Sequence, residues 1–313
     1  MALLVVGSVA LDSLQTPFGV RQDVLGGSAT YFSTAASYFG PVRVVAVVGE
    51  DFPEAHLDFL RGRGVDVSGL ERRPGRTFRW SGRYDFDLNQ AHTLDTQLNV
   101  FADFRPQLPD GFRDSSHLFL GNIDPDLQLA VLDQVRRPRL VAADTMNFWI
   151  TSKKPALLEV LKRVDLLFVN DAEARQLAGE HNVVKAARAI LSMGPRSVVV
   201  KRGEYGALYF SGGEVFASSA YPLAELFDPT GAGDSFAGGF MGYLSRVPAL
   251  DGAAMRRAIV VGSVLASFAV ERFSLDRLRE LGPHEIRARY AEFRRLSHFD
   301  DLDVEVLPVV SRG

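Results

Sequence analysis

The chain has 313 residues, of which 47% are hydrophobic and 23% are charged, a composition typical of a globular protein with a large core. Its formal net charge of -3 and pI of about 6.1 provide no basic surface for nucleic acid. The absence of cysteine excludes disulfides, thiolate metal sites and cysteine nucleophiles.

The start of the chain, Met1-Ala2-Leu3, lacks the basic segment of a signal peptide. No apolar run reaches the roughly 20 residues of a membrane span. We therefore expect a cytoplasmic protein, a monomer or homodimer, whose partner is a small molecule and neither a membrane nor a nucleic acid.

Short apolar runs alternate with helical patterns along most of the chain. The apolar runs predict buried strands at 3–6, 42–48, 117–120, 139–143, 166–169 and 197–201. The helical patterns cover 28–39, 126–134, 154–163, 171–179, 183–193, 233–244, 250–268 and 284–296. This alternation predicts an α/β fold with a doubly wound, mostly parallel sheet flanked by helices.

Two segments, 12–24 and 76–103, alternate polar and apolar residues instead, as in the stretch from Phe78 to Tyr84. Such alternation suits strands that are wet on one face. We expect a single domain spanning 1–313 that carries these segments as a small β-sheet lid. Surface hairpins without a covering role are the alternative.

Asp12 and the pair Gly26-Gly27 are expected at the carboxyl edge of the sheet, where open α/β sheets bind ligands. A carboxylate that accepts two hydroxyl groups, beside a backbone without side chains, suits a polyol. For Asp12 alone, an ordinary turn aspartate is an equal alternative.

Two acidic motifs follow later strands. Asn170-Asp171-Ala172-Glu173 follows strand 166–169, and its spacing fits a helix N-cap with a reciprocal partner. A single carboxylate such as Glu173 is also a typical indirect ligand of Mg²⁺. Asp144 and Asn147 follow strand 139–143 at the same edge of the sheet. A helix cap is one explanation of Asp144.

A turn at 202–207 follows strand 197–201 and contains Gly203 and Gly206. Lys201 or Arg202 could reach a phosphate there, or Lys201 could be a solvated turn lysine. One later helix face repeats small residues, which suits close packing or an adenine slot: Gly262, Ser263, Ala266 and Ser267.

Residues 228–241 read Asp-Pro-Thr-Gly-Ala-Gly-Asp-Ser-Phe-Ala-Gly-Gly-Phe-Met. Gly231, Ala232 and Gly233 leave the backbone bare at a helix start, where unpaired N–H groups and the macrodipole favour phosphate. Asp234 lies in the same turn, where a carboxylate could take a proton from a hydroxyl group. An oxyanion cradle beside a base is what phosphoryl transfer to an alcohol requires.

The segment 228–241 resembles the C-terminal signature of the ribokinase/PfkB family of carbohydrate kinases, and the resemblance covers nearly the whole chain. It implies a ribokinase-like fold and an ATP-dependent kinase that phosphorylates a hydroxymethyl group of a sugar. Asp234 would then be the catalytic base, and Gly231, Ala232 and Gly233 would form the anion hole.

The same resemblance implies the other site residues. Asp12, Gly26 and Gly27 would bind the substrate, Glu173 would order Mg²⁺ through water, and Asp144 and Asn147 would lie near the phosphates or the metal. The ATP contacts would come from Asn170, Lys201, Gly203, Gly206, Thr230 and Ser263, although many members have threonine where Lys201 stands. Some members are activated by a monovalent cation, which is therefore a further candidate cofactor.

Tyr31 stands where family members usually carry an asparagine that hydrogen-bonds the substrate, which leaves the sugar unidentified. The tyrosine could contact the substrate with its ring or phenol, or fill the core. Aromatic residues on the expected lid, Trp80, Tyr84 and Phe86, keep open an adenosine-like or cytidine-like nucleoside kinase. A non-catalytic sugar sensor is a third alternative, against which Asp234 argues.

Overall fold

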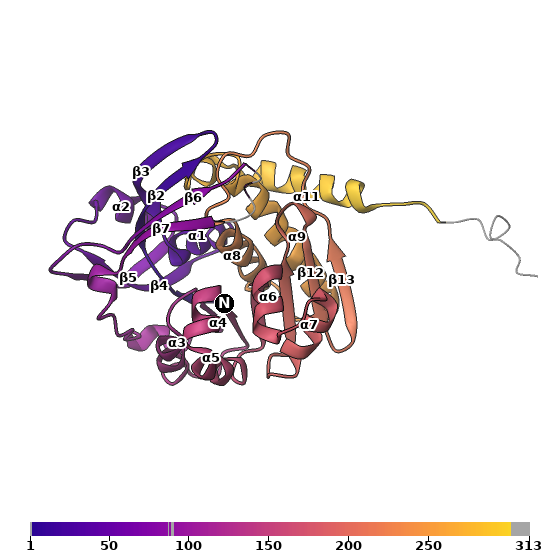
Figure 1. The fold of residues 1–313 in the computed structure, drawn as a ribbon, viewed down its shortest axis with the longest axis horizontal. Coiled ribbons are helices and arrows are strands. Elements are labelled where there is room, and N and C mark those ends of the chain that lie inside the picture. Colours follow the sequence, from indigo (N-terminus) through magenta and orange to yellow (C-terminus); the bar gives the residue numbers. More distant parts are fainter. Residues whose placement is uncertain (1, 87, 89–90, 302–313) are drawn as a thin grey trace, which may run out of the picture.

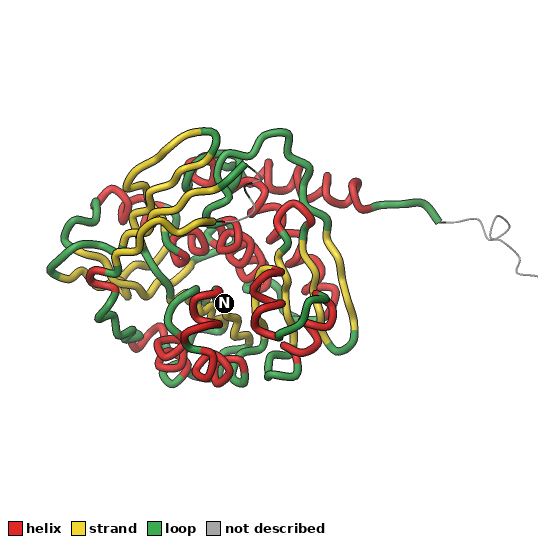
Figure 2. The backbone as a smooth tube through the Cα atoms, in the orientation of Figure 1, coloured by secondary structure: helices red, strands yellow, loops and turns green. Residues whose placement is uncertain are grey.

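A sheet of nine strands forms the centre of the molecule, with helices on both faces (Figures 1 and 2). The structure is a computed structural model that describes residues 2–86, 88 and 91–301. Residues 87, 89 and 90 of the expected lid, and residues 1 and 302–313 of the expected domain, lie outside the described residues.

The strand order of the large sheet is β13-β12-β11-β10-β9-β8-β1-β4-β5. All neighbours from β5 to β11 are parallel, whereas β12 and β13 continue the sheet antiparallel. The strands are β1 (Leu3–Val6), β4 (Val42–Gly49), β5 (Val65–Arg73), β8 (His117–Leu120), β9 (Leu140–Asp144), β10 (Leu166–Asn170), β11 (Ser197–Lys201), β12 (Ala207–Ser211) and β13 (Glu214–Ser218). The predicted doubly wound, mostly parallel sheet is therefore confirmed.

Each predicted helix is present with ends close to the predicted positions, and α2, α4 and α10 are additional. The helices are α1 (Ser28–Ala36), α2 (Glu54–Gly62), α3 (Pro125–Leu132), α4 (Asn147–Ser152), α5 (Lys154–Leu161), α6 (Asp171–Ala178), α7 (Val183–Leu191), α8 (Ala232–Leu244), α9 (Gly252–Ala269), α10 (Asp276–Glu280) and α11 (Pro283–Ser297). Short 3-10 turns lie at Asn99–Phe101, Asp110–Phe112 and Gly203–Tyr205.

The apolar pattern of these strands is continuous because each strand contributes side chains to the hydrophobic cores on both faces of the sheet. In β1, Leu3 and Val5 point into one core, and Leu4 and Val6 point into the core on the opposite face. Successive side chains of a strand alternate between faces, so a strand covered on both sides must be apolar at every position. This is why the strand positions could be predicted from short apolar runs.

A second sheet of four strands, in the order β3-β2-β6-β7, matches the two alternating segments. Its strands are β2 (Ala10–Thr16), β3 (Gly19–Gly26), β6 (Arg79–Tyr84) and β7 (Ala91–Gln97), at the upper left of Figure 1. We call this sheet the lid.

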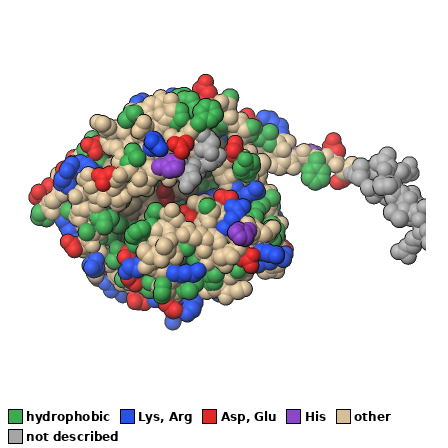
Figure 3. All heavy atoms as spheres, viewed as in Figure 1, with side chains coloured by type: hydrophobic (Ala, Val, Ile, Leu, Met, Phe, Trp, Pro, Cys, Tyr) green, Lys and Arg blue, Asp and Glu red, His purple; other side chains and the backbone are tan. Residues whose placement is uncertain are grey.

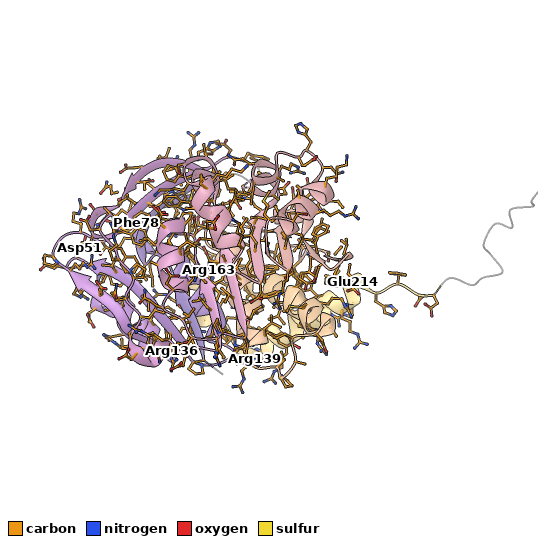
Figure 4. All side chains as sticks on the ribbon, turned by 90° about the horizontal axis from the view of Figure 1, so that it is seen from below. Asp51, Phe78, Arg136, Arg139, Arg163 and Glu214 are labelled. Carbon is orange, nitrogen blue, oxygen red and sulfur yellow. The ribbon has the colours of Figure 1, made fainter. Side chains whose placement is uncertain are left out.

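The lid is attached to the large sheet where β4 ends. Asp51 accepts hydrogen bonds from the Thr77 amide (2.7 Å) and from Arg79 Nη1 (2.7 Å). Figure 4 shows Asp51 and Phe78 on the same side of the molecule, far from Glu214 of β13. The carboxylate of Asp51 therefore ties the first lid residues of β6 to the carboxyl end of β4.

The helices and strands that the sequence analysis did not predict are α2, α4, α10, β5 and the β12–β13 hairpin. Strand β5 is an edge strand with many partly exposed polar residues, so it lacks the continuous apolar pattern of the inner strands. The same holds for β13, which is mostly exposed.

Helix α9 is, by length and composition, apolar enough to cross a membrane, but 67% of it is buried inside the fold. Together with α8 it forms part of the larger core. The small-residue face of α9 serves this packing, since a Cβ on Gly262 would lie 2.8 Å from the Phe236 carbonyl oxygen.

Helix α8 packs against α1 without intervening side chains. A Cβ on Gly238 would lie 2.3 Å from the Phe32 carbonyl oxygen, and one on Gly242 would lie 2.7 Å from the Phe39 ring. Because Gly238 faces Phe32 and Gly242 faces Phe39, the two helices run in the same direction. Their N-termini therefore lie side by side at the carboxyl edge of the sheet (Figure 1).

We predict that Gly238→Ala destabilises the protein, because its methyl group would overlap the backbone of α1. Overpacking of this kind costs about 1–3 kcal/mol. The matched control is Gly62→Ala at the end of α2, where a Cβ meets nothing within 4 Å. Thermal unfolding should show a lower Tm for Gly238→Ala and an unchanged or higher Tm for the control; equal Tm values would contradict the packing argument.

Candidate active site

A polar pocket of about 160 Å³ opens at the carboxyl ends of β8, β9, β10 and β11, beside the N-terminus of α8. It brings together six residues that the sequence analysis singled out, Asn170, Glu173, Lys201, Gly233, Asp234 and Asp144, with three others, Asn122, Thr145 and Met146. Figure 3 shows that the surface on this side of the molecule is hollowed near its centre, below the lid.

The N-terminus of α8 forms one wall of this pocket. Gly231 is the N-cap, with a left-handed φ of 74°, and a Cβ there would lie 2.3 Å from the Tyr31 ring. Among the described residues, the N–H groups of Gly231, Gly233 and Asp234 have no acceptor. Three donors at a helix start are suited to bind an anion.

Ala232 differs from the sequence-based expectation. Its N–H donates to the Pro229 carbonyl oxygen at 3.2 Å and closes the turn before the helix. The free donors at the start of α8 are therefore the amides of Gly231, Gly233 and Asp234, and the Ala232 amide is not one of them. A backbone turn cannot be read from residue type alone, which is why the sequence did not reveal this bond.

The Asp234 carboxylate lies half-buried at the end of this turn. Burial, and secondarily the carboxylate of Asp144, raise the pKa of Asp234 to about 7, while Lys201 opposes the shift. A carboxylate with a pKa near neutrality has the basicity expected of a general base.

Lys201 lies between these carboxylates. Its Nζ donates to Asp144 Oδ2 at 2.8 Å, and both side chains are largely buried. The same Nζ would lie 2.9 Å from a Cβ on Gly233, so the ammonium group lies against the first turn of α8. The alternative of a solvated turn lysine is therefore wrong.

Asn170 and Glu173 form the helix cap that their spacing indicated. Asn170 Oδ1 accepts from the Glu173 amide (2.7 Å), and Glu173 Oε2 accepts from the Asn170 amide (2.7 Å). Burial and the nearby Asp144 raise the pKa of Glu173 to about 7, with Lys201 opposing the shift. Both residues also line the pocket, so the cap positions the Glu173 carboxyl group there.

Asp12 is buried at the start of the lid, next to Gly26 and Gly27. A Cβ on Gly26 would lie 1.9 Å from Asp12 Oδ2, and one on Gly27, whose φ is 92°, would lie 2.5 Å from the Ser8 carbonyl oxygen. Burial raises the pKa of Asp12 to about 8; the Gly27 backbone opposes this, and the carboxylates of Asp228 and Asp234 reinforce it. Only glycines allow the chain to pass so close to the carboxylate.

Tyr31 connects these two regions. Its side chain is buried, its ring covers Gly231, and its hydroxyl group has no hydrogen-bond partner among the described residues. The core-filling alternative for Tyr31 therefore accounts for its ring, while the phenol remains available to a bound ligand.

The lid contacts the segment 228–231 directly. Thr230 Oγ1 donates to the Tyr84 hydroxyl at 3.0 Å, and the Thr230 amide donates to Asp228 Oδ1 at 2.9 Å. At the lid hairpin tip, the Phe18 ring packs on Phe227 with centroids 5.3 Å apart. The lid is thus in contact at two places with residues 227–230, which precede the free amides of α8.

The remaining expected nucleotide residues lie outside the pocket. Gly203 (φ 53°) and Gly206 (φ 84°) shape the turn after β11, and a Cβ on Gly206 would lie 2.0 Å from the Ser218 carbonyl oxygen. Ser263 is buried and donates to the Ile259 carbonyl oxygen within α9. Asn147 is exposed at the start of α4 and accepts from the Phe148 amide.

Asn122, Thr145 and Met146 were missed by the sequence analysis. Each follows a strand of the parallel sheet, so their positions after 117–120 and 139–143 were the available signal. Thr145 Oγ1 is buried and has no hydrogen-bond partner among the described residues, so it can contact a bound ligand.

The donor set fits a nucleotide with Mg²⁺. Free amides and Lys201 suit phosphate oxygens, and the carboxylates suit a hard cation. In the part of the chain that the structure describes, no group of three His, Asp or Glu side chains could hold a metal ion by itself. A Mg²⁺ ion bound here would therefore use water and phosphate oxygens as further ligands.

Comparison with known proteins agrees with this chemistry. Residues 8–279 match the profile of the pfkB family carbohydrate kinases. A cytidine kinase of Thermococcus kodakarensis is 32% identical over 252 residues, which cover 78% of this chain and 88% of that protein. A 2-dehydro-3-deoxygluconokinase of Thermoproteus tenax is 30% identical over 268 residues, which cover 76% of this chain and 79% of that protein.

Solved structures share the fold. An E. coli protein designated Ribokinase II, in its apo form, aligns with a TM-score of 0.77 at 21% identity, over 93% of this chain and 99% of that chain. The same designation in complex with ATP and Mg²⁺ aligns with a TM-score of 0.70 at 21% identity, over 94% of this chain and 97% of that chain.

We predict that Asp12→Asn stabilises the free protein more at high pH than at low pH. The folded-state pKa of Asp12 is about 8, whereas an unfolded aspartate has a pKa of about 3.9. Between these values the folded protein retains a proton that the unfolded chain has released, so stability falls as the pH rises. Asparagine does not ionise, so the variant avoids this pH-dependent loss of stability.

Thermal unfolding at about pH 5 and about pH 8 tests this expectation. The Tm gain of Asp12→Asn over the natural protein should be larger at the higher pH. The control is Asp58→Asn, whose side chain is 67% exposed and should show no such pH-dependent gain. A gain that does not grow with pH would refute the assigned cause.

Proposed function

This chain belongs to the pfkB family of carbohydrate kinases, and on that premise we propose that it transfers the γ-phosphoryl group of ATP to a hydroxymethyl group of a sugar ring. The family membership makes the chain a sugar or nucleoside kinase, a phosphotransferase with an alcohol group as acceptor. The proposal concerns the acceptor, the nucleotide and the role of each residue.

The observation that carries the proposal is the half-buried Asp234 beside the free amides of Gly231 and Gly233. In the proposed reaction, the hydroxyl oxygen of the acceptor forms a bond to the γ-phosphorus while the bond to the β–γ bridging oxygen breaks. ADP leaves with that electron pair, and the hydroxyl proton passes to Asp234. The amides at the start of α8 stabilise the charge on the phosphoryl oxygens.

Asp12, Gly26 and Gly27 are proposed to bind the acceptor. The Asp12 carboxylate accepts hydrogen bonds from ring hydroxyls, and the two glycines allow the ring to approach the backbone. Tyr31 forms the wall between this site and Gly231, and its unpartnered hydroxyl is available for a further bond.

The nucleotide is proposed to bind along the carboxyl ends of β10 and β11. Asn170, Lys201 and Thr230 would contact phosphates, and Gly203, Gly206 and Ser263 would shape the region of the base. Glu173 would hold Mg²⁺ through water. Bound Mg²⁺ supplies positive charge to the phosphate oxygens, and a monovalent cation is a further candidate activator.

The lid is proposed to close over the acceptor and exclude water, which protects ATP from hydrolysis. The contacts of Tyr84 with Thr230 and of Phe18 with Phe227 support this role, since they already join the lid to the segment that leads into the anion hole.

A nucleoside is the second candidate acceptor, and Trp80 favours it. Trp80 is paired with Asp12 in the β2–β6 register, so both side chains lie on the same lid face. A Cβ on Gly82 would lie 2.1 Å from the Trp80 indole, which therefore covers Gly82. A partly exposed aromatic plane beside the polyol site could stack on a nucleobase. The 32% identity to a cytidine kinase supports the same acceptor class.

A panel of free sugars and nucleosides, assayed for ADP formation with ATP and Mg²⁺, separates these acceptors. Turnover of sugars alone supports the first, and turnover of nucleosides supports the second. Ligand-dependent thermal stabilisation without any ADP formation would support a sugar sensor and refute the kinase proposal.

We predict that Asp234→Asn folds and binds ATP but loses turnover by roughly 10²–10⁴-fold or more, because the amide cannot accept the hydroxyl proton. Steady-state rates with the best acceptor of the panel measure the loss, and calorimetric titration with ATP measures binding. A near-normal kcat would exclude Asp234 as the base.

We predict that Glu173→Gln raises the Mg²⁺ concentration needed for half-maximal activity, because the neutral amide attracts the hydrated cation less strongly. The matched control is Glu159→Gln, whose side chain is 57% exposed on α5 and paired only with Lys162 in the described structure. Mg²⁺ titrations that coincide for all three proteins would count against the metal role of Glu173.

A further inference from the structure

The described residues that line the pocket include one cation and three carboxylates. The cation is Lys201, and the carboxylates are Asp144, Glu173 and Asp234. A nucleoside triphosphate adds several negative charges to this already acidic site. Lys201 is therefore the protein's own source of positive charge inside the pocket.

Lys201 is held against the place where the transferred group would be. The side chain is 18% exposed, and Nζ would lie 2.9 Å from a Cβ on Gly233. Gly233 belongs to the first turn of α8, whose free amides form the proposed anion hole. The ammonium group and these amides therefore border the same space.

Asp144 does not depend on Lys201 for its position. Asp144 Oδ1 accepts from the Thr145 amide at 2.8 Å, and its carbonyl oxygen accepts from Gln128 Nε2 at 3.0 Å. An ammonium group has three donors, and the hydrogen bonds of the described residues show one used, by Asp144. Lys201 thus retains donors for an incoming anion.

A structural role alone explains this arrangement poorly. Removing a lysine and a carboxylate from water costs several kcal/mol per ion, so a buried pair contributes little net stability. A phosphate group offers the ammonium a better partner, since charge-assisted bonds to phosphate are strong in a water-excluded site.

We infer that Lys201 is a catalytic residue that binds the γ-phosphoryl oxygens of ATP and stabilises their charge during transfer, with Asp144 holding it in position beforehand. The inference rests on the proposed ATP-dependent function. Lys201 neither gives nor takes a proton in this role; the bonds that form and break are those of the phosphoryl transfer described above.

The test compares nucleotides that differ in the γ-phosphoryl group. Calorimetric titrations of the full chain with Mg²⁺ and either ADP or a non-hydrolysable ATP analogue give two Kd values for each protein. For Lys201→Met we expect the Kd of the ATP analogue to rise roughly tenfold or more, while the Kd of ADP changes much less. We also expect kcat to fall by roughly 10²–10³-fold.

Gly233→Ala is a second variant that keeps the lysine. Its methyl group would lie 2.9 Å from Nζ and displace the ammonium, while alanine favours the helix more than glycine does. As for Lys201→Met, we expect the Kd of the ATP analogue to rise and the Kd of ADP to change much less. The control, Lys162→Met, removes a surface lysine that is 58% exposed and should change neither Kd.

If the Kd values of ADP and of the ATP analogue rise equally in Lys201→Met, the inference is overturned, because the lysine then only neutralises Asp144. Unchanged binding of both nucleotides would also overturn it. If Lys201→Met does not fold, Gly233→Ala decides by the same criterion. These titrations need no acceptor, so a panel without any turnover would refute the proposed acceptor while leaving the test of Lys201 intact.

Discussion

The site depends on close contact between the first turn of α8 and its neighbours. Gly231 lies under the Tyr31 ring, Gly233 lies against the Lys201 ammonium, and Gly238 lies on the α1 backbone. A side chain at Gly231 or Gly238 would push α8 away from its neighbours, and one at Gly233 would displace the Lys201 ammonium. The bare backbone of the helix therefore sets both the packing of the core and the exposure of its amides to the pocket.

The acidic character of the site opposes stability. Asp12 is buried and Glu173 and Asp234 are half-buried, and the loss of contact with water raises the pKa of each to about 7 or 8. Ionising these groups lowers the free energy of unfolding, because in the unfolded chain they lie in water and ionise at their ordinary, lower pKa. Functional sites commonly retain groups that are unfavourable for folding. The two hydrophobic cores on either face of the sheet offset this cost.

The lid provides the part of the site that the large sheet lacks. Asp12 is a lid residue, yet its carboxylate lies close enough to Asp234 for each charge to influence the other. The Asp51 carboxylate fastens β6 to the end of β4, and Tyr84 reaches Thr230. Acceptor-binding and phosphate-binding residues therefore come from different sheets that meet at one edge.

The sequence by itself determined the inner strands, most helices and the signature at 228–241. Apolar runs buried on both sides, and glycines next to an acid at a helix start, have local physical causes that a sequence retains. It also indicated the cap between Asn170 and Glu173, which the structure contains. Edge strands such as β5 and β13 escaped prediction because partial exposure removes the apolar pattern.

Only the tertiary structure decided which of these residues share a pocket. The fold pairs Lys201 with Asp144 and places Asn122 and Thr145 in the pocket lining. It also engages the Ala232 amide in a turn and leaves Ser263 and Asn147 outside the pocket. The physical reason is that hydrogen bonds and charge interactions depend on distances between distant parts of the chain. Strand order and helix packing fix those distances, and no local pattern of residues records them.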